Sequence, residues 1–584
     1  MAGILSYLLI FLLSFSFLGG QLPPPESRRI PVLHPGIESL GRRPDSRIHA
    51  WIFFRDKGLE RGSYPGALAK AEAELTQPAV SRRSKVMGNT IVSFRDIPVN
   101  DLYIDRVIAS GASLRQKSRW LNAVSVSATE EQLAAISLFS FVASIDPVLV
   151  HKRPLTKEEE LLPLQGWGQP RGLPTGTADT LDYGNSADQI RQIRGDLAHE
   201  AGYAGQGVVV LMLDTGYFKD HESIQKDRII AEWDFINGDG NTQDEGGDSV
   251  RQHSHGTYTL SALGGFKPGS LIGPAYESKF LLAKTEIVAE EIQQEEDNYV
   301  AALEWGERLG AHVASSSLGY LDWYTYRDMD GNTAVTTKAV DTAVSLGIVC
   351  ITSAGNEGSG DWYYIIAPAD ADSVISVGAV DSRGQIAPFS SHGPTYDGRF
   401  KPEVTARGVG TFCASAAGVD RYAQVSGTSL AAPLVAGGAA VILSAHPGWT
   451  PMMVREALLK TASRADFPDN SYGWGIIDIW AAINFSSFSG GPNPYPPSRF
   501  RLAQNYPNPF NVSTIIPFDV PVQSHVSLIV FNLLGQPIAT LVDDEREIGR
   551  YSVQWNGSRF PSGLYLFQMK SGEFTESRKM ILIK

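Results

Sequence analysis

The chain has 584 residues, a formal net charge of −13, 43% hydrophobic residues and 19% charged residues. At about 150 residues per domain this length predicts a multidomain protein, and the average composition argues against wholesale disorder and against a polytopic membrane protein. The acidic balance argues against a nucleic-acid binder, because phosphate neutralisation needs clustered Lys and Arg.

The N-terminus predicts a secretory signal peptide over residues 1–20. An apolar run from Ile4 to Leu18 ends in two glycines and is followed by prolines. The run is shorter than the ~20 apolar residues that span a bilayer, so export is favoured over the alternative of a single membrane anchor.

Residues 21–150 are predicted to contain a small α+β domain after an exposed lead-in. Arg47 to Phe54 is typical of a strand, Pro65 to Leu75 of a helix, and Asn122 to Ala128 alternates with the strand period. Thr129 then opens a capped helix. Residues 151–182 are rich in Lys, Glu, Pro, Gly and Thr and indicate a cleavable linker.

Residues 183–485 are predicted to form an α/β domain with a mostly parallel sheet flanked by helices. Buried-type strands such as Val208 to Leu213 and Gly347 to Ala354 alternate with helical segments such as Tyr299 to Leu309. Residues 486–498 form a linker rich in Pro, Gly and Ser. Residues 499–584 show short alternating strands, including Val526 to Phe531, and predict a small β-sandwich.

The chain has only two cysteines, Cys350 and Cys413, which are too few for disulfides to hold a protein of this size together. They could form one bridge or remain as two thiols. Buried thiols are the favoured alternative, because free cysteine behaves as a small hydrophobic residue.

Three short motifs in the α/β domain carry candidate catalytic groups. Asp214-Thr-Gly ends a buried strand, where open α/β sheets build their sites. His255-Gly-Thr follows, and Ser429 stands in Gly427-Thr-Ser-Leu-Ala-Ala-Pro at the start of an apolar helix, whose N-terminus favours developing negative charge. Each motif alone is also common in ordinary turns and helix caps. Their joint order, Asp then His then Ser, differs from the orders of chymotrypsin and the α/β-hydrolases.

With these motifs, the chain resembles the subtilisin-like serine peptidases, or subtilases, from about Tyr183 to Asn484. Further stretches are similar to that family: Ser315-Ser-Ser-Leu-Gly-Tyr, Ser353-Ala-Gly-Asn-Glu, Phe389-Ser-Ser-His-Gly-Pro and Lys401-Pro-Glu-Val. The resemblance implies an endopeptidase in which Ser429 is the nucleophile, His255 its general base and Asp214 the residue that orients His255. It also implies that the side chain of Asn356 donates to the oxyanion of the tetrahedral intermediate.

The resemblance also implies where the side chain before the scissile bond binds. Six residues would wall this pocket: Ser317, Leu318, Gly319, Ser353, Ala354 and Gly355. Small residues leave room for large side chains, so we expect broad endopeptidase specificity on protein or peptide substrates. Glu357 could favour a basic residue near the cut, but an exposed loop carboxylate is more often merely solvated.

This chemistry requires no cofactor, and two acidic loops leave calcium open as a bound ion. One contains Asn237-Gly-Asp-Gly-Asn and Asp244-Glu-Gly-Gly-Asp before His255, and Asp328-Met-Asp-Gly-Asn repeats the pattern. Calcium takes such carboxylate and amide oxygens. Neither run has the EF-hand glycine at the sixth position, and acidic glycine-rich loops are usually exposed turns.

The flanking segments resemble two other modules. Asn122 to Ile136 and the following Ser144-Ile-Asp-Pro-Val are similar to the propeptides of subtilases, which implies a precursor whose own propeptide is an intramolecular inhibitor; the alternative is an independent α+β module. Leu502-Ala-Gln-Asn-Tyr-Pro-Asn-Pro-Phe-Asn and Pro561-Ser-Gly-Leu-Tyr resemble the C-terminal sorting domains of type IX secretion substrates. This implies a bacterial secretion machinery as partner and a secreted or cell-surface location; the alternative is a carbohydrate-binding or adhesion module.

Two further functional classes are weighed against the endopeptidase. A catalytically idle adhesin on a subtilase scaffold need not keep all four of Asp214, His255, Asn356 and Ser429, and all four are present. Another serine hydrolase, such as an esterase, is disfavoured because the sequence has no Gly-x-Ser-x-Gly motif.

Overall fold

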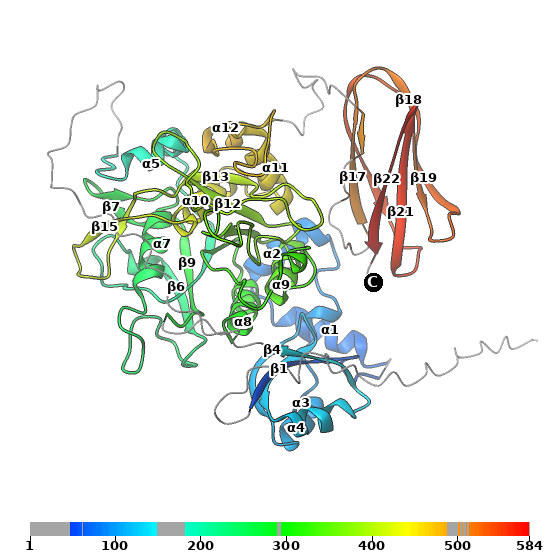
Figure 1. Cartoon of the computed structure of the whole chain (residues 1–584), viewed down its shortest axis with the longest axis horizontal. Coiled ribbons are helices and arrows are strands. Elements are labelled where there is room, and N and C mark those ends of the chain that lie inside the picture. The colour runs from blue at the N-terminus through cyan, green and yellow to red at the C-terminus, as the bar shows by residue number, and fades with distance from the viewer. Residues whose placement is uncertain are drawn as a thin grey trace, which may run out of the picture.

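The computed structural model describes residues 47–60, 62–148, 181–288, 294–486, 500–502, 505, 510 and 513–582. Figure 1 shows three folded parts in chain order, coloured blue to cyan, green to yellow, and orange to red. The predicted signal peptide and nearly all of the two predicted linkers lie outside the described residues.

The first part is built on a four-stranded antiparallel sheet with the order β2-β3-β1-β4. Helices α3 and α4 bury Ile104 and Leu133 in one core with the sheet. Thr129 caps α4, as predicted: its hydroxyl accepts from the Gln132 N–H, and the Gln132 side chain accepts from the Thr129 N–H. The elements are β1 (Ile48–Phe54), α1 (Tyr64–Ala73), α2 (Gln77–Met87), η2 (Phe94–Asp96), α3 (Asp101–Ala109), β2 (Ser113–Ser118), β3 (Ala123–Ala128), α4 (Glu130–Ser137) and β4 (Val142–Val148).

The second part contains a seven-stranded parallel sheet with the order β13-β12-β11-β10-β5-β9-β6. Helices cover both faces, as parallel sheets require. Along β5, Val210 and Met212 face the core that includes α10 (Thr428–Ala445), whereas Leu211 and Leu213 face α8 (Gln294–Leu309) and α9 (Val335–Ser345). The strands are β5 (Val209–Asp214), β6 (Ile229–Asp234), β9 (Lys279–Lys284), β10 (Val313–Ser316), β11 (Val349–Ser353), β12 (Ile375–Val380) and β13 (Val404–Arg407).

Ten helices and four short strands complete this second part within its described residues. The helices are α5 (Ala187–Gln192), α6 (Gly195–Glu200), η3 (Lys226–Arg228), α7 (Ser254–Gly264), α8 (Gln294–Leu309), η4 (Tyr326–Asp328), α9 (Val335–Ser345), α10 (Thr428–Ala445), α11 (Pro451–Thr461) and α12 (Ile479–Ile483). The short strands are β7 (Phe266–Lys267), β8 (Leu271–Ile272), β14 (Thr411–Ala414) and β15 (Tyr422–Val425). Of the helices in the described parts of the chain, α10 is the one long and apolar enough to cross a membrane, but 89% of it is buried inside the protein. It is therefore a core helix.

Both cysteines are buried and unbridged, which confirms the favoured prediction of two thiols. Cys350 lies on β11 and Cys413 on β14. Burial raises the pKa of the Cys350 thiol well above its ordinary value, so this group is an inert part of the core.

The third part confirms the predicted β-sandwich. One sheet has the order β16-β17-β20 and the other β19-β18-β21-β22. Side chains of both sheets, including Phe518, Leu528 and Phe567, share one core. The strands are β16 (Arg501–Leu502), β17 (Ser513–Val520), β18 (Ser524–Phe531), β19 (Pro537–Arg546), β20 (Gly549–Asn556), β21 (Gly563–Ser571) and β22 (Phe574–Leu582).

Candidate active site

The carboxylate of Asp214 lies at the carboxyl end of β5, inside the parallel sheet. Its side chain is 1% exposed. Oδ1 accepts a hydrogen bond from the Thr215 N–H at 2.8 Å, and Oδ2 accepts one from the Thr259 hydroxyl at 2.9 Å. A buried carboxylate needs such donors to remain ionised. Thr259 was not predicted as a site residue, because its role depends on α7 turning it toward β5.

The imidazole of His255 is in the first turn of α7 and contacts Asp214 directly. The His255 Nδ1 and Asp214 Oδ1 atoms are 2.6 Å apart. This bond selects the tautomer in which Nδ1 carries the proton and Nε2 is the basic nitrogen. The next residue must be a glycine, because a Cβ on Gly256 would lie 2.1 Å from the carbonyl oxygen of Gly216. That close approach brings α7 onto the turn after β5.

Ser429 is the second residue of α10, directly after the turn at Gly427. Helix α10 packs against α7, so the helices that carry Ser429 and His255 are neighbours. The Ser429 hydroxyl donates to the Ser317 carbonyl at 3.3 Å, and the Ser317 hydroxyl donates to the Ser429 carbonyl at 2.7 Å. These two bonds tie the start of α10 to the loop that follows β10.

Asn356 is exposed after the turn that ends β11. Gly355 in this turn has a φ of +109°, which favours glycine. The Asn356 Oδ1 accepts from both the N–H and the hydroxyl of Thr428, each at 2.9 Å. Because the Asn356 Oδ1 faces Thr428, the Asn356 Nδ2 group points away from Thr428 and is left as a donor. Thr428 is therefore a positioning residue that the motif alone did not reveal.

Five of the six predicted wall residues lie in two loops that follow neighbouring parallel strands, β10 and β11, and Ser353 is the last residue of β11. Ile366 lies between these loops. A Cβ on Gly319 would be 2.3 Å from the Ile366 Cδ1, and a Cβ on Gly355 would be 3.1 Å from the same atom. The Ile366 N–H also donates to the Ala354 carbonyl at 3.2 Å.

Ile366 is a further side chain beside the predicted pocket walls. The isoleucine side chain, which is 7% exposed, occupies the space that the two glycines leave. Sequence reasoning missed Ile366 because it arrives from a segment that no motif connects with either loop.

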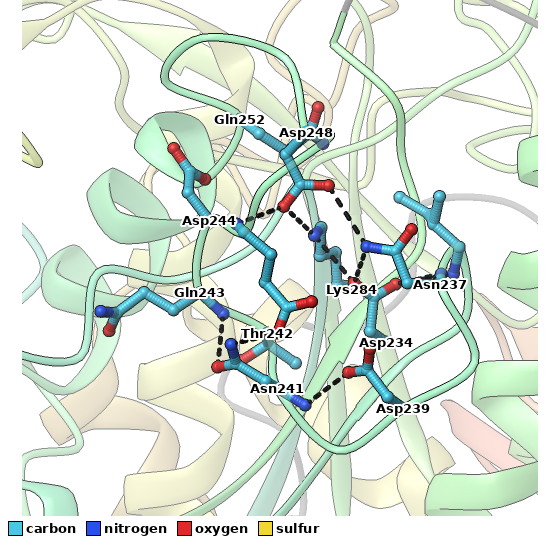
Figure 2. A network of polar contacts seen from close by, with 12 residues as sticks. Asp234, Asn237, Asp239, Asn241, Thr242, Gln243, Asp244, Asp248, Gln252 and Lys284 are labelled. Atoms are coloured by element: carbon cyan, nitrogen blue, oxygen red, sulfur yellow. Dashed lines mark hydrogen bonds and ion pairs between the residues drawn. The ribbon is translucent and has the colours of Figure 1, made fainter.

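A buried lysine, Lys284 at the end of β9, reaches into the loop before α7, one of the two loops for which calcium was left open. Figure 2 shows Lys284 among Asp234, Asn237 and Asp248. In the second loop, the Asp328 carboxylate accepts from the N–H and the hydroxyl of Thr325, both at 2.7 Å. Within the described ranges, no three His, Cys, Asp or Glu side chains are grouped so that they could hold a metal ion.

The first part of the chain binds the second part along α8. The Glu304 carboxylate accepts from the Ser118 hydroxyl at 2.6 Å and from the Trp120 N–H at 3.2 Å. The Asp297 carboxylate is 3.0 Å from the Arg115 guanidinium. The edge of the antiparallel sheet is therefore anchored to α8 by hydrogen bonds and an ion pair.

A second anchor comes from α2, which lies outside that sheet. Arg82 and Arg83 are at most 2% exposed and both bind the Glu307 carboxylate of α8, Arg83 at 2.6 Å. Arg83 also pairs with Asp96 at 2.7 Å. Buried charges of this kind are tolerated only when they are paired, so α2 packs closely against α8. The sequence predicted neither α2 nor this contact.

Comparisons with known proteins assign all three parts of the chain. The model of the subtilase family matches residues 205–475, that of the peptidase S8 propeptide domain of Bacteroidota matches residues 49–160, and that of the secretion system C-terminal sorting domain matches residues 504–584. The chain is 33% identical to subtilisin E of Bacillus subtilis (strain 168) over 310 residues, covering 52% of this chain and 72% of that protein.

Two further relatives agree. The chain is 33% identical to subtilisin of Bacillus pumilus over 308 residues, 52% of this chain and 99% of that protein. It is 28% identical to an alkaline protease of Shouchella clausii over 356 residues, 61% of this chain and 83% of that protein.

Proposed function

Because the chain belongs to the subtilase family of serine endopeptidases, we propose that it hydrolyses peptide bonds through an acyl-enzyme on Ser429, with His255 and Asp214 completing the triad. The observation that carries this proposal is the 2.6 Å hydrogen bond between Asp214 and His255, beside the helix that has Ser429 as its second residue. No cofactor is needed for this reaction.

In the proposed mechanism, the Ser429 hydroxyl turns from the Ser317 carbonyl toward His255. The His255 Nε2 accepts the hydroxyl proton while the serine oxygen attacks the peptide carbonyl carbon. The imidazolium then protonates the leaving amine, and the C–N bond breaks to leave the acyl-enzyme. Water, deprotonated by the same nitrogen, releases the acid and restores Ser429. Asp214 orients the imidazole and stabilises the imidazolium.

The oxyanion is assigned to Asn356 and the Ser429 backbone N–H. The two hydrogen bonds from Thr428 to the Asn356 Oδ1 support this role, because they leave the amide N–H groups to face the substrate. Removing one such donor typically costs ~3–4 kcal/mol of transition-state stabilisation. The start of α10 adds its dipole to the same charge.

The packing of Ile366 supports a substrate preference. The side chain before the scissile bond would enter between Gly319 and Gly355, where Ile366 limits the depth. We therefore expect cleavage after small residues to be favoured over cleavage after large aromatic residues.

The two flanking parts concern the secretion and maturation of the enzyme. The C-terminal sorting domain directs secretion across the outer membrane to the cell surface or the extracellular space, and the propeptide domain is bound to the catalytic part. We infer that the propeptide inhibits the precursor until it is cut away. Residues 149–180 lie outside the described residues.

The proposal is tested with casein and a serine-directed fluorophosphonate. The wild type should hydrolyse casein and be labelled, and Ser429→Ala should lose both. Ser426→Ala is the matched control, because Ser426 lies three residues earlier and accepts a hydrogen bond from the Gly410 N–H at 3.1 Å. Equal labelling of the wild type and Ser429→Ala would refute the assignment.

A further inference from the structure

An ammonium group occupies the centre of the acidic loop that leads to His255. The loop runs from the end of β6 at Asp234 to the start of α7, and Lys284 reaches into it from the end of β9 (Figure 2). The Lys284 Nζ is 2.8 Å from Asp234 Oδ2 and 2.7 Å from Asp248 Oδ2. Lys284 and Asp234 are fully buried, and the Asp248 side chain is 7% exposed.

The two carboxylates that Lys284 binds also accept hydrogen bonds from N–H groups of the loop. Asp234 Oδ1 accepts from the backbone N–H groups of Ile236 at 2.7 Å and Asn237 at 3.0 Å. Asp234 Oδ2 accepts from the Asn237 side chain at 3.1 Å, and Asp248 Oδ2 accepts from the Glu245 N–H at 2.8 Å. A calcium ion would instead need several of these lone pairs at about 2.3–2.6 Å. The loop is thus organised around donors.

Strand register explains why the lysine lies here. In the parallel sheet, Lys284 of β9 is directly opposite Asp234 of β6 on one side and Asp214 of β5 on the other. Burial alone would lower the pKa of Lys284, but the hydrogen bonds to Asp234 and Asp248 outweigh burial and raise it above its ordinary value. A divalent ion at the same oxygens would be repelled by this fixed positive charge.

The loop also holds the helix that carries His255. The Asp244 Oδ1 accepts from the His253 N–H at 2.7 Å, and the His253 Nδ1 accepts from the Asp244 N–H at 3.0 Å. The Gln252 side chain donates to the Thr215 carbonyl at 2.9 Å, beside the turn after β5. Since His253 directly precedes α7, the shape of the loop fixes the position of the first turn of this helix.

We propose that Lys284 is a built-in cation that takes the place of a divalent metal in this loop and so positions the start of α7. The residues of this loop therefore do not fit calcium as long as Lys284 is present. Removing the ammonium should turn the same oxygens into a calcium site. The inference concerns binding and stability, so it can fail while the proposed peptidase function stands.

The experiment uses the full chain with Ser429→Ala to prevent self-cleavage, and adds Lys284→Met. Thermal unfolding is followed in EDTA and in millimolar calcium, and calcium binding is measured by calorimetry. In the parent, which retains Lys284, calcium should not raise the Tm through binding to this loop. In EDTA, Lys284→Met should lower the Tm by about 5 °C or more, because a buried carboxylate pair loses its counter-charge. Calcium should restore at least half of that loss, and calorimetry should detect one additional bound calcium.

Three controls decide the outcome. Lys284→Arg keeps a cation and should remain insensitive to calcium. Lys219→Met removes a partly exposed lysine that pairs with Glu232 at 2.6 Å in the same region, and should lower the Tm slightly without rescue by calcium. With Lys284 intact, Asp234→Asn should leave the response to calcium unchanged.

The proposal is overturned if calcium stabilises the parent and Asp234→Asn abolishes that effect. It is equally overturned if Lys284→Met gains no calcium response or does not fold in calcium, because Lys284 would then be an ordinary buried ion pair.

Discussion

At the scale of single residues, we propose that one isoleucine limits the side chains that the two pocket loops accept. Ile366 packs against both Gly319 and Gly355. Its side chain, which comes from another segment, occupies space beside these two glycines. Pocket depth in such a site is set by the residue at its base as much as by the residues on its walls. The contact of Ile366 with the two loops is not encoded by any local motif.

Replacing Ile366 with Gly should open the pocket. With peptide anilides that differ only in the residue before the scissile bond, the ratio of kcat/KM for Phe over Ala should rise at least ~10-fold, since each buried methylene is worth about 0.8 kcal/mol. Ile366→Val removes one methylene and should give a smaller change in the same direction. An unchanged ratio in a folded Ile366→Gly enzyme would exclude Ile366 as the base of the pocket.

The candidate catalytic residues could be predicted from sequence because each stands in a short motif with its own physical signature. Asp214 ends an apolar strand, and Ser429 is the second residue of an apolar helix. Lys284, Ile366 and Thr428 could not be predicted in this way. Their roles depend on strand register or on contacts between segments far apart in the chain.

At the scale of secondary-structure elements, α8 is the main support for the propeptide. It carries Asp297, Glu304 and Glu307, which bind the edge of the propeptide sheet and helix α2. Burial raises the pKa of Asp297 to about 6. Burial also tends to raise the pKa of Glu307, but the bonds from Arg83 and the charge of Arg82 outweigh it and lower that pKa.

The raised pKa of Asp297 predicts how pH affects propeptide binding. Once α8 is uncovered, this carboxyl should return toward its ordinary pKa, so the complex takes up a proton that the free enzyme does not hold. The contribution of Asp297 therefore favours the complex at low pH and is lost as the pH rises through about 6. The loss amounts to at most about 100-fold in affinity, since two pKa units separate the two states.

This prediction is measured as inhibition of the mature enzyme by its cleaved propeptide at pH 5 and pH 7, for the wild type and Asp297→Asn. His312 acts in the opposite direction, because burial and the charges of Arg82 and Lys85 lower its pKa to about 4. The difference between the two enzymes isolates the effect of Asp297. As the pH rises, propeptide binding should weaken more for the wild type than for the variant. Identical pH dependence would contradict the contribution.

Helices and strands could be predicted from the sequence where the pattern that specifies them is local. The capped helix at Thr129 and the alternating strand predicted at Val526 to Phe531, which lies within β18, both appear, because capping and period-two burial need no distant partner. The α2 helix was not predicted. Its sequence contains two adjacent arginines that suit a surface helix, whereas the structure buries both against Glu307.

At the scale of the whole molecule, the three parts divide maturation, catalysis and export. The secreted enzyme should begin between about Lys152 and Gly184, and a chain that ends at residue 486 should remain inside the outer membrane. Fractionation of a bacterium with this secretion system, with immunoblotting and N-terminal sequencing, measures both. The matched control is the full chain with Ser429→Ala, which should be exported. Export of the truncated chain, or a mature N-terminus at the signal cleavage site, would contradict this division.

The arginines of the propeptide have a consequence that outlasts inhibition. While they are in place, the carboxylates along α8 are neutralised and hidden from water. After the propeptide leaves, the peptidase exposes the carboxylates of α8 as an acidic surface that the precursor does not expose. Maturation thus changes the surface met by neighbouring molecules, and this acidic surface should repel acidic proteins at low ionic strength.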